Sequence, residues 1–356
     1  MSKLPSNWQV KSLGEVAEFI NGRAFKPEEW GTKGLPIIRI QNLTGFSSIY
    51  NYFDGDVNDK NLVRKNDILI SWSASLGVYV WNGNDAVLNQ HIFKVELKND
   101  IDRIFFYYLI KTKIDEMIDN VHGSTMKHIT KGRFDNIKVK LPPLLIQKQI
   151  AEILEKADEA KQKRKEANKL TDEFLQSVFI EMFGDPVKNP KGFPIRPLEK
   201  VCFKITDGTH NSPKNNEKGT HKYITAKNIK RIGFDLKNIT YISELDHKAI
   251  YSRCNPEFED VLYIKDGVTT GIAQVNTLKE EFSMLSSLAL FKLNKSILNP
   301  YYLRDYLNNE FVYQNIRNSM GGAAITRLTV DKLKRIQVFV TPLSLQQQFA
   351  VIVNKT

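Results

Sequence analysis

The hydrophobic residues of this chain follow two periods, one typical of strands and one typical of helices. Short runs at residues 67–70 and 260–263 consist of β-branched and apolar residues near turn-forming residues, which predicts buried strands joined by turns. The longer stretches at residues 101–120 and 298–318 predict a helix in each half of the chain. The pattern therefore predicts an α+β fold in which each half has a strand-rich body.

A different spacing begins at Ile146, where apolar residues alternate at intervals of four and three positions, as in a heptad seam. Prolines at residues 142–143 precede this stretch, and Gly-Asp-Pro at residues 184–186 ends it. We predict a helix of about 40 residues that is about 60 Å long. Because so narrow a stripe needs a partner helix, we expect a coiled coil, with an isolated connector helix as the alternative. The predicted partner-binding residues are Ile146, Ile150, Ile153, Ala157, Phe174 and Val178.

The most informative feature is an internal repeat. Residues 122–152 align with residues 321–351 at a constant offset of 199, and Gln147 falls on Gln346. The same domain is therefore expected twice. Looser matches pair residues 35–42 with 221–228, residues 89–91 with 287–289, and residues 93–95 with 291–293.

The repeat and the helix between its copies divide the chain into four predicted segments. They are a first domain at residues 1–143, the long helix at 144–185, a second domain at 186–341 and a second helix at 342–356. In the last segment Leu345 and Phe349 take the places of Ile146 and Ile150, but the sequence ends before such a helix would be complete. We therefore expect a stub of the second helix, and a second chain or a second copy of this one could complete the rod.

The charge of the chain points to a polyanionic partner without deciding it. The 356 residues carry a net charge of +11 at pH 7, and the pI is about 9.3. Such a surplus favours nucleic acid, because contacts with phosphates release counterions, although a basic protein that never meets nucleic acid is the alternative. A secretory pattern and a run long enough to cross a bilayer are both missing, so we expect a cytoplasmic protein with no membrane contact. Cys202 and Cys254 are expected to be buried thiols.

Several polar positions differ between the copies although the framework around them is similar. Arg-Ile-Gln at residues 39–41, for example, aligns with Thr-Ala-Lys at residues 225–227. Because such side chains read base edges, variation within a fixed frame predicts two different half-sites of one bipartite DNA target. Ordinary solvated turn residues are the alternative at each position. The candidate DNA-binding residues are Arg39, Gln41, Asn42, Ser71, Ser73, Gln90, His91, Ser124, Lys127, Lys227, Asn228, Thr269, Thr270, Ser287 and Arg327.

No motif predicts catalysis by the chain itself. Leu-Pro-Pro-Leu at residues 141–144 lacks the flanking residues of an adenine methyltransferase motif, and neither a dinucleotide-binding glycine motif nor a Walker A loop is present. Asp85 with Glu96 and Lys98 comes nearest to a nuclease site, but the second copy lacks the acid, so a polar strand end is the preferred interpretation. The histidines have no companions at zinc-ligand spacing. We expect no catalytic residue and no metal site.

The order of these features resembles that of the specificity subunits of type I restriction–modification systems. The resemblance rests on Pro-Leu-x-x-Gln-x-Gln at residues 143–149 and 342–348, which leads into each long helix. Further cues lie at residues 8–15, 38–42, 182–186 and 192–194. Their order and repetition, rather than any one motif, carry the resemblance.

The resemblance implies that each copy is a target recognition domain and that the two read an asymmetric pair of half-sites in double-stranded DNA. It implies that the paired helices act as a ruler and as the dock for two methyltransferase subunits. Those subunits bring S-adenosylmethionine, and motor–nuclease subunits that use ATP and Mg²⁺ can join them. The chain itself would bind no cofactor. A recognition subunit of a fused nuclease–methyltransferase system and a stand-alone DNA-binding regulator are the alternatives.

Overall fold

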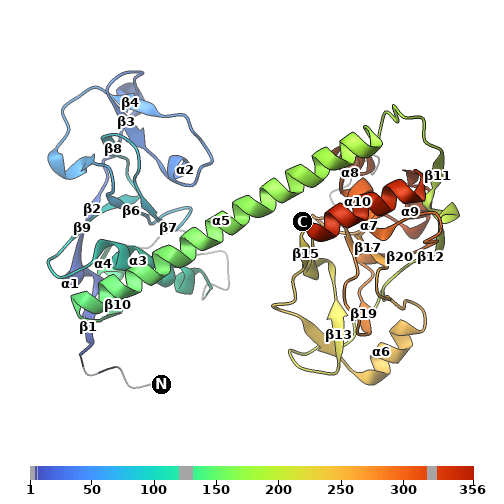
Figure 1. Cartoon of the computed structure of the whole chain (residues 1–356). Coiled ribbons are helices and arrows are strands. Elements are labelled where there is room, and N and C mark those ends of the chain that lie inside the picture. Colours follow the sequence, from blue (N-terminus) through green and yellow to red (C-terminus); the bar gives the residue numbers. More distant parts are fainter. Residues whose placement is uncertain (1–4, 6, 120–130, 319–326) are drawn as a thin grey trace. The chain divides into compact units, whose positions relative to one another are not determined.

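The computed structural model describes residues 5, 7–119, 131–318 and 327–356. They form two compact units, Met1–Lys163 and Arg164–Thr356, and the division falls within the longest helix (Figure 1). Each unit combines helices and strands, which confirms the mixed fold expected from the sequence. The four predicted segment boundaries stay predictions, because the structural division lies inside the predicted helical segment and not at either of its ends.

The body of the first unit is a four-stranded antiparallel sheet in the order β2-β9-β6-β7. Its strands are β2 (Ala17–Asn21), β6 (Ile68–Ser71), β7 (Gly77–Val80) and β9 (Ile92–Leu97). Strand β6 is buried on both faces, since Ile68 and Ile70 pack into one hydrophobic cluster and Leu69 packs into another. This explains why its sequence reads as a continuous apolar run rather than an alternating one.

A second sheet of the first unit has the order β4-β3-β8-β5. Its strands are β3 (Leu35–Ile38), β4 (Asn51–Phe53), β5 (Leu62–Val63) and β8 (Ala86–Leu88). Because β3 and β8 are parallel, the segments that follow them leave the sheet at the same edge. A separate ribbon pairs β1 (Gln9–Ser12) with β10 (Lys138–Leu141).

The second unit repeats this arrangement. Its main sheet has the order β12-β20-β17-β18, its second sheet has the order β16-β13-β19, and a ribbon pairs β11 with β21. The strands are β11 (Ile195–Pro197), β12 (Cys202–Asp207), β13 (His221–Ile224), β14 (Ile229–Lys230), β15 (Gly233–Phe234), β16 (Thr240–Ile242), β17 (Val261–Ile264), β18 (Ala273–Val275), β19 (Phe282–Met284), β20 (Leu288–Leu293) and β21 (Gln337–Phe339). The repeat seen in the sequence is therefore a repeat of sheet order as well.

The helices are short except for one. They are α1 (Leu13–Val16), α2 (Ile40–Leu43), α3 (Arg103–Asp119), α4 (Lys131–Asp135), α5 (Leu144–Phe183), α6 (Glu244–Tyr251), α7 (Pro300–Asn308), α8 (Glu310–Asn318), α9 (Val330–Lys334) and α10 (Leu343–Lys355), with 3₁₀ turns η1 (Pro27–Glu29), η2 (Asp59–Asn61), η3 (Leu198–Lys200) and η4 (Ala226–Asn228). Helix α3 matches the stretch predicted at residues 101–120, but the stretch predicted at 298–318 is two helices and not one.

Two consecutive asparagines explain this break. The side chain of Asn308 is buried and exchanges two hydrogen bonds with the backbone of Ala273, at 2.9 and 2.8 Å. Asn309 leaves the helical conformation, and its Oδ1 accepts the N–H of Phe311 (3.1 Å) at the start of α8. Side chains that bond to backbone in this way compete with a continuous helix.

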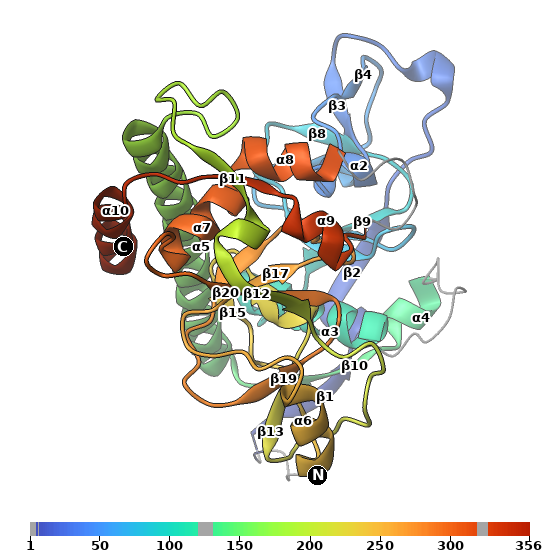
Figure 2. The same ribbon diagram turned by 90° about the vertical axis from the view of Figure 1, so that its right-hand side faces the viewer.

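The predicted long helix is confirmed as α5, which runs over 40 residues. Near its start, Ala151 is buried in the core of the first unit. Near its end, Phe179 and Phe183 enter the core of the second unit, where Phe349 of α10 lies 5.5 Å from both rings. Helix α10 therefore runs beside the last part of α5 (Figure 2).

A buried glutamine fixes the start of α5 to the first unit. Oε1 of Gln147 accepts the N–H of Asp102 at 2.9 Å, ahead of α3. Its Nε2 donates to the carbonyls of Asp100 (3.1 Å) and Pro142 (2.9 Å). One amide thus satisfies three backbone groups from two separate segments in a largely buried setting.

The second unit has the same device. Oε1 of Gln346 accepts the N–H of Asn299 (2.8 Å), and its Nε2 donates to the carbonyls of Ile297 (3.0 Å) and Thr341 (2.8 Å). Both glutamines are buried, and they occupy equivalent positions of the sequence repeat. The aligned Gln-x-Gln signature is therefore structural at its first glutamine.

Replacing Gln147 by alanine is expected to lower the free energy of unfolding by about 2–3 kcal/mol, because the variant leaves one buried donor and two acceptors without partners. Gln149→Ala is the matched control, since Gln149 lies on the same helix and is exposed, and a change there should stay within about 0.5 kcal/mol. Urea denaturation followed by circular dichroism measures both. Equal midpoints for the two variants would contradict the role assigned to Gln147.

Candidate nucleic-acid interface

Several predicted DNA-binding residues of the first unit meet where β3 and β8 end. Arg39 and Gln41 follow β3 directly, and Gln90 follows β8. The N–H of Asn89 donates to the carbonyl of Ile38 (3.1 Å), which joins the two chain segments beyond the sheet. These residues were predicted from separate parts of the sequence, and the parallel pairing of β3 with β8 brings them together.

The end of β6 joins the same place. The backbone N–H of Trp72 donates to the carbonyl of His91 (3.1 Å), and the two rings lie edge to face at 4.8 Å. The indole N–H of Trp72 also donates to Oδ1 of Asn21 at the end of β2 (3.2 Å). We call this group the first strand-end cluster: Asn21, Arg39, Gln41, Trp72, Gln90 and His91.

An equivalent group forms in the second unit. The N–H of Leu285 donates to the carbonyl of Ile224 (3.0 Å), and the N–H of Lys265 donates to the carbonyl of Ser287 (2.9 Å). Asp266 pairs with Arg327, whose Nε lies 3.4 Å from its Oδ1. We call this group the second strand-end cluster: Asp207, Lys227, Lys265, Asp266, Ser287 and Arg327.

These contacts correct one part of the predicted repeat alignment. Residues 89–91 were aligned with 287–289, but Asn89 forms the isolated parallel bridge that Leu285 forms in the second unit. Residues 89–91 therefore match residues 285–287, and by the pairing of β9 and β20 residues 93–95 match 289–291. The predicted alignment was wrong by two residues here, a shift that keeps the alternation of buried and exposed side chains.

The corrected alignment exposes a contrast that sequence reasoning missed. Lys265 stands where the first unit has Trp72, and it lies 3.5 Å from Asp207, the counterpart of Asn21. The first cluster therefore holds a neutral indole–amide pair where the second holds a buried ion pair. The signal was present in the sequence, because Trp72 and Lys265 each lie two residues beyond the aligned apolar runs at 67–70 and 260–263.

The positive charge of Lys265 is compensated by the neighbouring carboxylates of Asp207 and Asp266. Its side chain is only 2% exposed, and its ammonium also lies 3.0 Å from Oδ2 of Asp266. Arg253 adds a second cation at 3.2 Å from Asp207. A buried charge is tolerated only when it is paired in this way, so the cluster has a fixed geometry.

Three of the predicted DNA-binding residues are buried hydroxyls, and the structure corrects their role. Ser71 and Thr270 are fully buried, and Ser73 is 6% exposed. The hydroxyl of Ser71 donates to the carbonyl of Ser75, and that of Thr270 donates to the carbonyl of Gly267 at 2.6 Å. Ser71 ends β6, Ser73 follows it and Thr270 follows β17, and their hydroxyls do not face solvent where DNA could meet them.

The two predicted asparagines are also framework residues. Oδ1 of Asn42 accepts the N–H of Arg39 (3.0 Å), and its Nδ2 donates to the carbonyl of Ile49 (2.9 Å). Asn228 makes the same pair of bonds, accepting from the N–H of Thr225 and donating to the carbonyl seven residues later, both at 3.0 Å. Their amides therefore take part in the turns that follow β3 and β13, and base reading by either residue stays a prediction.

The other predicted residues keep accessible side chains. Gln41, Gln90, Lys227, Thr269 and Arg327 are exposed, and Arg39, His91 and Ser287 are partly exposed. The guanidinium carbon of Arg39 lies 4.2 Å from the centre of the Trp30 ring, within the range of a cation–π interaction. Their contact with DNA stays a prediction. Ser124 and Lys127 lie outside the described residues.

The second cluster borders a polar cleft. Its lining includes Ser212, Asn215, Tyr223, Lys227, Asn228 and Ser287. Burial raises the pKa of Tyr223 above its usual value, so its hydroxyl stays protonated at neutral pH. Hydroxyl, amide and ammonium groups together offer the donors and acceptors that base edges and phosphates require.

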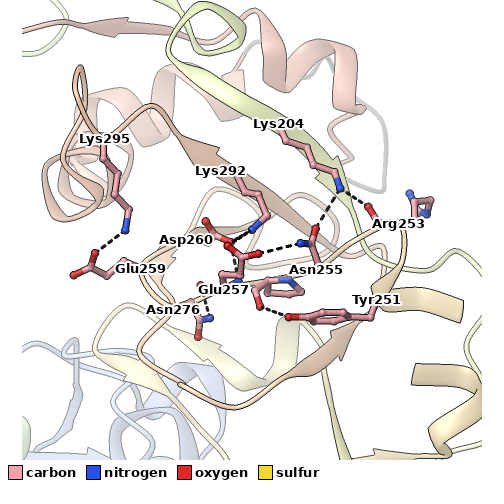
Figure 3. Close-up of polar contacts among 11 residues, drawn as sticks. Lys204, Tyr251, Arg253, Asn255, Glu257, Glu259, Asp260, Asn276, Lys292 and Lys295 are labelled. Carbon is pink, nitrogen blue, oxygen red and sulfur yellow. Dashed lines mark hydrogen bonds and ion pairs between the residues drawn. The ribbon is translucent and has the colours of Figure 1, made fainter. Parts of the chain in front are cut away.

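Other cations of the second unit are engaged in ion pairs or hydrogen bonds (Figure 3). Lys292 lies 2.9 Å from Asp260, whose pKa burial raises although the lysine acts in the opposite direction. Lys295 pairs with Glu259 at 2.7 Å, and Lys204 donates to the carbonyl of Arg253 at 2.7 Å. These groups fasten the segment after α6 to β12 and β20, which leaves them little freedom to neutralise phosphate.

The structure gives the nuclease-like residues ordinary neighbours. Glu96 pairs with Lys94 at 3.3 Å, and Lys98 donates to the carbonyl of Gly14 at 2.9 Å. No group of three or more His, Cys, Asp or Glu residues in the described part of the chain could hold a metal ion. Among the described helices, none is long and apolar enough to span a bilayer.

The predicted partner-binding helix has apolar residues of two kinds. Ile150 and Val178 pack against the cores of their own units, so they serve the fold. Ile153 is 67% exposed and Phe174 is 50% exposed. Ile146 is partly exposed, and Ala157 is exposed. The predicted docking face therefore keeps the exposed residues in the middle of α5, such as Ile153 and Phe174, and loses Ile150 and Val178, which pack on the cores.

Comparison with known proteins shows that the chain is similar to DNA specificity proteins. Residues 5–171 match the family described as type I restriction modification DNA specificity domain. The type I restriction enzyme MjaIX specificity subunit of Methanocaldococcus jannaschii is 23% identical, over 99% of this chain and 88% of that protein. The EcoBI specificity subunit of Escherichia coli is 24% identical, over 97% of this chain and 78% of that protein.

A solved structure shares the fold. The crystal structure of a type I restriction–modification S subunit from M. genitalium superposes with a TM-score of 0.59 at 17% sequence identity. The match covers 99% of this chain and 91% of the other. The mixture of strand-rich bodies and a long helix is thus a known arrangement.

Glycine is required at one point of each strand-end cluster. A Cβ on Gly22 would lie 2.0 Å from the carbonyl oxygen of Asn89, and one on Gly208 would lie 2.0 Å from that of Met284. We expect Gly22→Ala and Gly208→Ala each to destabilise the protein by about 1–3 kcal/mol, because backbone must move.

Gly132→Ala is the matched control for both substitutions. Nothing lies within 4 Å of a Cβ at this helical glycine, so the change should stabilise by about 0.5–1 kcal/mol. Thermal denaturation of the three variants measures the difference. If Gly22→Ala leaves the melting temperature unchanged, the backbone of Gly22 does not lie as close to the carbonyl of Asn89 as in this structure, and the requirement for glycine is contradicted.

Proposed function

Because residues 5–171 match the type I restriction modification DNA specificity domain and two specificity subunits are similar over nearly the whole chain, we propose that this chain reads a bipartite, asymmetric DNA site through its two strand-end clusters. The observation that carries the proposal is the repeat itself. The two clusters are built from equivalent strand ends, yet their exposed side chains differ. Equal frames with different side chains are what a protein needs in order to read two different short sequences in the same way.

The chemistry of the two clusters supports different half-sites. In the first, Gln41 and Gln90 offer paired donors and acceptors, and amides of this kind suit the N6 and N7 edge of adenine. In the second, Lys227 and Arg327 offer only donors, which suit the acceptors of guanine. Each good contact of this type is worth about 1–3 kcal/mol of discrimination between bases.

The middle of α5 suits a protein partner. Leu170 is 58% exposed one helical turn from the half-exposed Phe174, and neighbouring exposed apolar side chains on one helix face can form an interaction surface. We propose that this face docks two methyltransferase subunits, which bring S-adenosylmethionine and modify adenine, and that motor–nuclease subunits with ATP and Mg²⁺ join them in the cytoplasm. The chain would then supply recognition and no catalytic group. A stand-alone regulator would have no use for such a face.

Methylation mapping tests the recognition role directly. DNA from cells that express this chain with its methyltransferase should carry a bipartite, asymmetric adenine-methylated motif that is missing when the methyltransferase is expressed alone. Gln90→Ala should relax or weaken one half-site, and Lys227→Ala should affect the other, each with a loss of roughly 10- to 100-fold at the affected half.

The buried serine provides the control for this experiment. Ser71→Ala should leave the motif unchanged, because Ser71 does not reach solvent. Loss of both half-sites in a single-cluster variant would contradict the division of labour between the clusters. A motif that is the same with and without this chain would contradict the recognition role.

Aspartate at the exposed seam tests the docking face. Ile153→Asp with Phe174→Asp should abolish co-purification with methyltransferase, because a buried charge without a partner costs several kcal/mol. Both side chains are exposed in the chain by itself, so its fold and melting temperature should not change. Phe203→Asp, which alters a phenylalanine that is 77% exposed on β12, is the control. Normal assembly of the double variant would rule the seam out.

A further inference from the structure

One cation occupies the same place in both copies of the repeat. When residues 131–141 are aligned with residues 330–340, Arg133 falls on Lys332, and at no other position of these stretches do both copies carry a positive charge. The other lysines of the first stretch align with uncharged residues: Lys131 with Val330, Lys138 with Gln337 and Lys140 with Phe339. A cation is therefore kept where the rest of the basic pattern has changed.

The backbone around this position is also the same. Arg133 lies on α4 and Lys332 on α9, and the residue that follows each of them is an apolar anchor. Phe134 is 1% exposed and its ring lies 4.9 Å from that of Phe19, while Leu333 is fully buried. With its neighbour fixed in the core, each cation must project outward, and both are exposed.

The second cation lies close to the second strand-end cluster. The N–H of Leu328 donates to the carbonyl of Lys265 at 2.8 Å, which ties the segment ahead of α9 to the end of β17. Thr329 then caps α9, and its Oγ1 accepts the N–H of Lys332 at 3.3 Å. Lys332 thus lies on the helix that follows Arg327, the residue of this segment that we propose reads bases.

Two neighbouring cations form ion pairs, whereas Arg133, Lys332 and also Lys131 on α4 form none among the described residues. Lys334 pairs with Asp331 (3.2 Å), and Lys138 lies 3.8 Å from Glu15. Within residues 5, 7–119, 131–318 and 327–356, Arg133 and Lys332 form no ion pair within 4.0 Å. Their charges remain available to an anion from outside the chain.

We propose that Arg133 and Lys332 are equivalent phosphate contacts, one for the DNA backbone at each half-site. Two readers of different sequences need different base contacts, but the phosphates that flank every sequence are alike. A contact common to both copies at an exposed position is therefore expected to be a backbone contact. This inference rests on the proposed function, and it adds the residues that position each recognition domain without contributing to its specificity.

The salt dependence of DNA binding tests this assignment on the full-length chain. Fluorescence anisotropy is measured on a 40-base-pair duplex that carries the mapped motif and on a scrambled duplex, between about 50 and 200 mM salt. Arg133→Ala and Lys332→Ala should each reduce the slope of log K against log salt by about 0.9, and the double variant should reduce it by about 1.8. Binding to both duplexes should weaken by the same factor, so that the ratio between them is unchanged.

Matched controls lie on the same two helices. Lys131→Ala on α4 and Lys334→Ala on α9 remove one charge each, but neither position is basic in both copies, so the slope should stay near that of the unaltered chain. Arg133→Lys should restore the slope, because a phosphate contact needs a positive charge more than a particular shape.

The outcomes separate this inference from the function on which it rests. If the unaltered chain binds neither duplex, recognition by this chain fails. If it binds and the control variants change the slope as much as Arg133→Ala and Lys332→Ala do, the effect is one of net charge and the assignment is wrong. Loss of methyltransferase binding with normal DNA binding would instead assign the two cations to an acidic protein surface, which also overturns the proposal.

Discussion

The structure depends on one repeated interaction, the buried glutamine amide that ties a helix to the backbone of its unit. Gln147 and Gln346 each bind one N–H and two carbonyls, so a single side chain joins the start of a helix to the segment ahead of another helix. Such bonds are directional, unlike apolar contacts, and they fix the angle at which the helix leaves the sheet.

A fixed frame allows the rest of each unit to vary. Asn42 and Asn228 close the same turn with the same bonds, and the strand ends around them meet in the same order. At one equivalent position of that order, the first unit has the hydrogen-bonded pair of Trp72 and Asn21. The second unit has the buried ion pair of Lys265 and Asp207 there. Each arrangement satisfies its own polar groups, so the surface beside it can change without loss of the fold.

Much of this could be predicted from the sequence, because the repeat and the heptad spacing are long patterns. The 40-residue helix, the sheet-rich bodies and several strand-end residues follow from them. The alignment slipped by two residues at 89–91 because strands alternate with a period of two, and a two-residue shift leaves every side chain on its proper face. The buried positions of Ser71 and Thr270 could not be predicted, since a loop hydroxyl looks the same in sequence whether it bonds to backbone or faces water.

The middle of α5 raises the question of what selects its apolar residues. Ion pairs along the helix, such as Lys156 with Glu152 (2.6 Å) and Lys169 with Glu173 (3.6 Å), are each worth only about 0.3–0.5 kcal/mol. Burying a side chain such as Ile153 or Phe174 is worth about 1.5–3 kcal/mol, and neither core of this chain provides that burial. The fold of this chain alone therefore gains little from apolar residues at these two positions. Their apolar character is therefore best explained by binding to another chain, and the helix would serve assembly at its middle and folding at its ends.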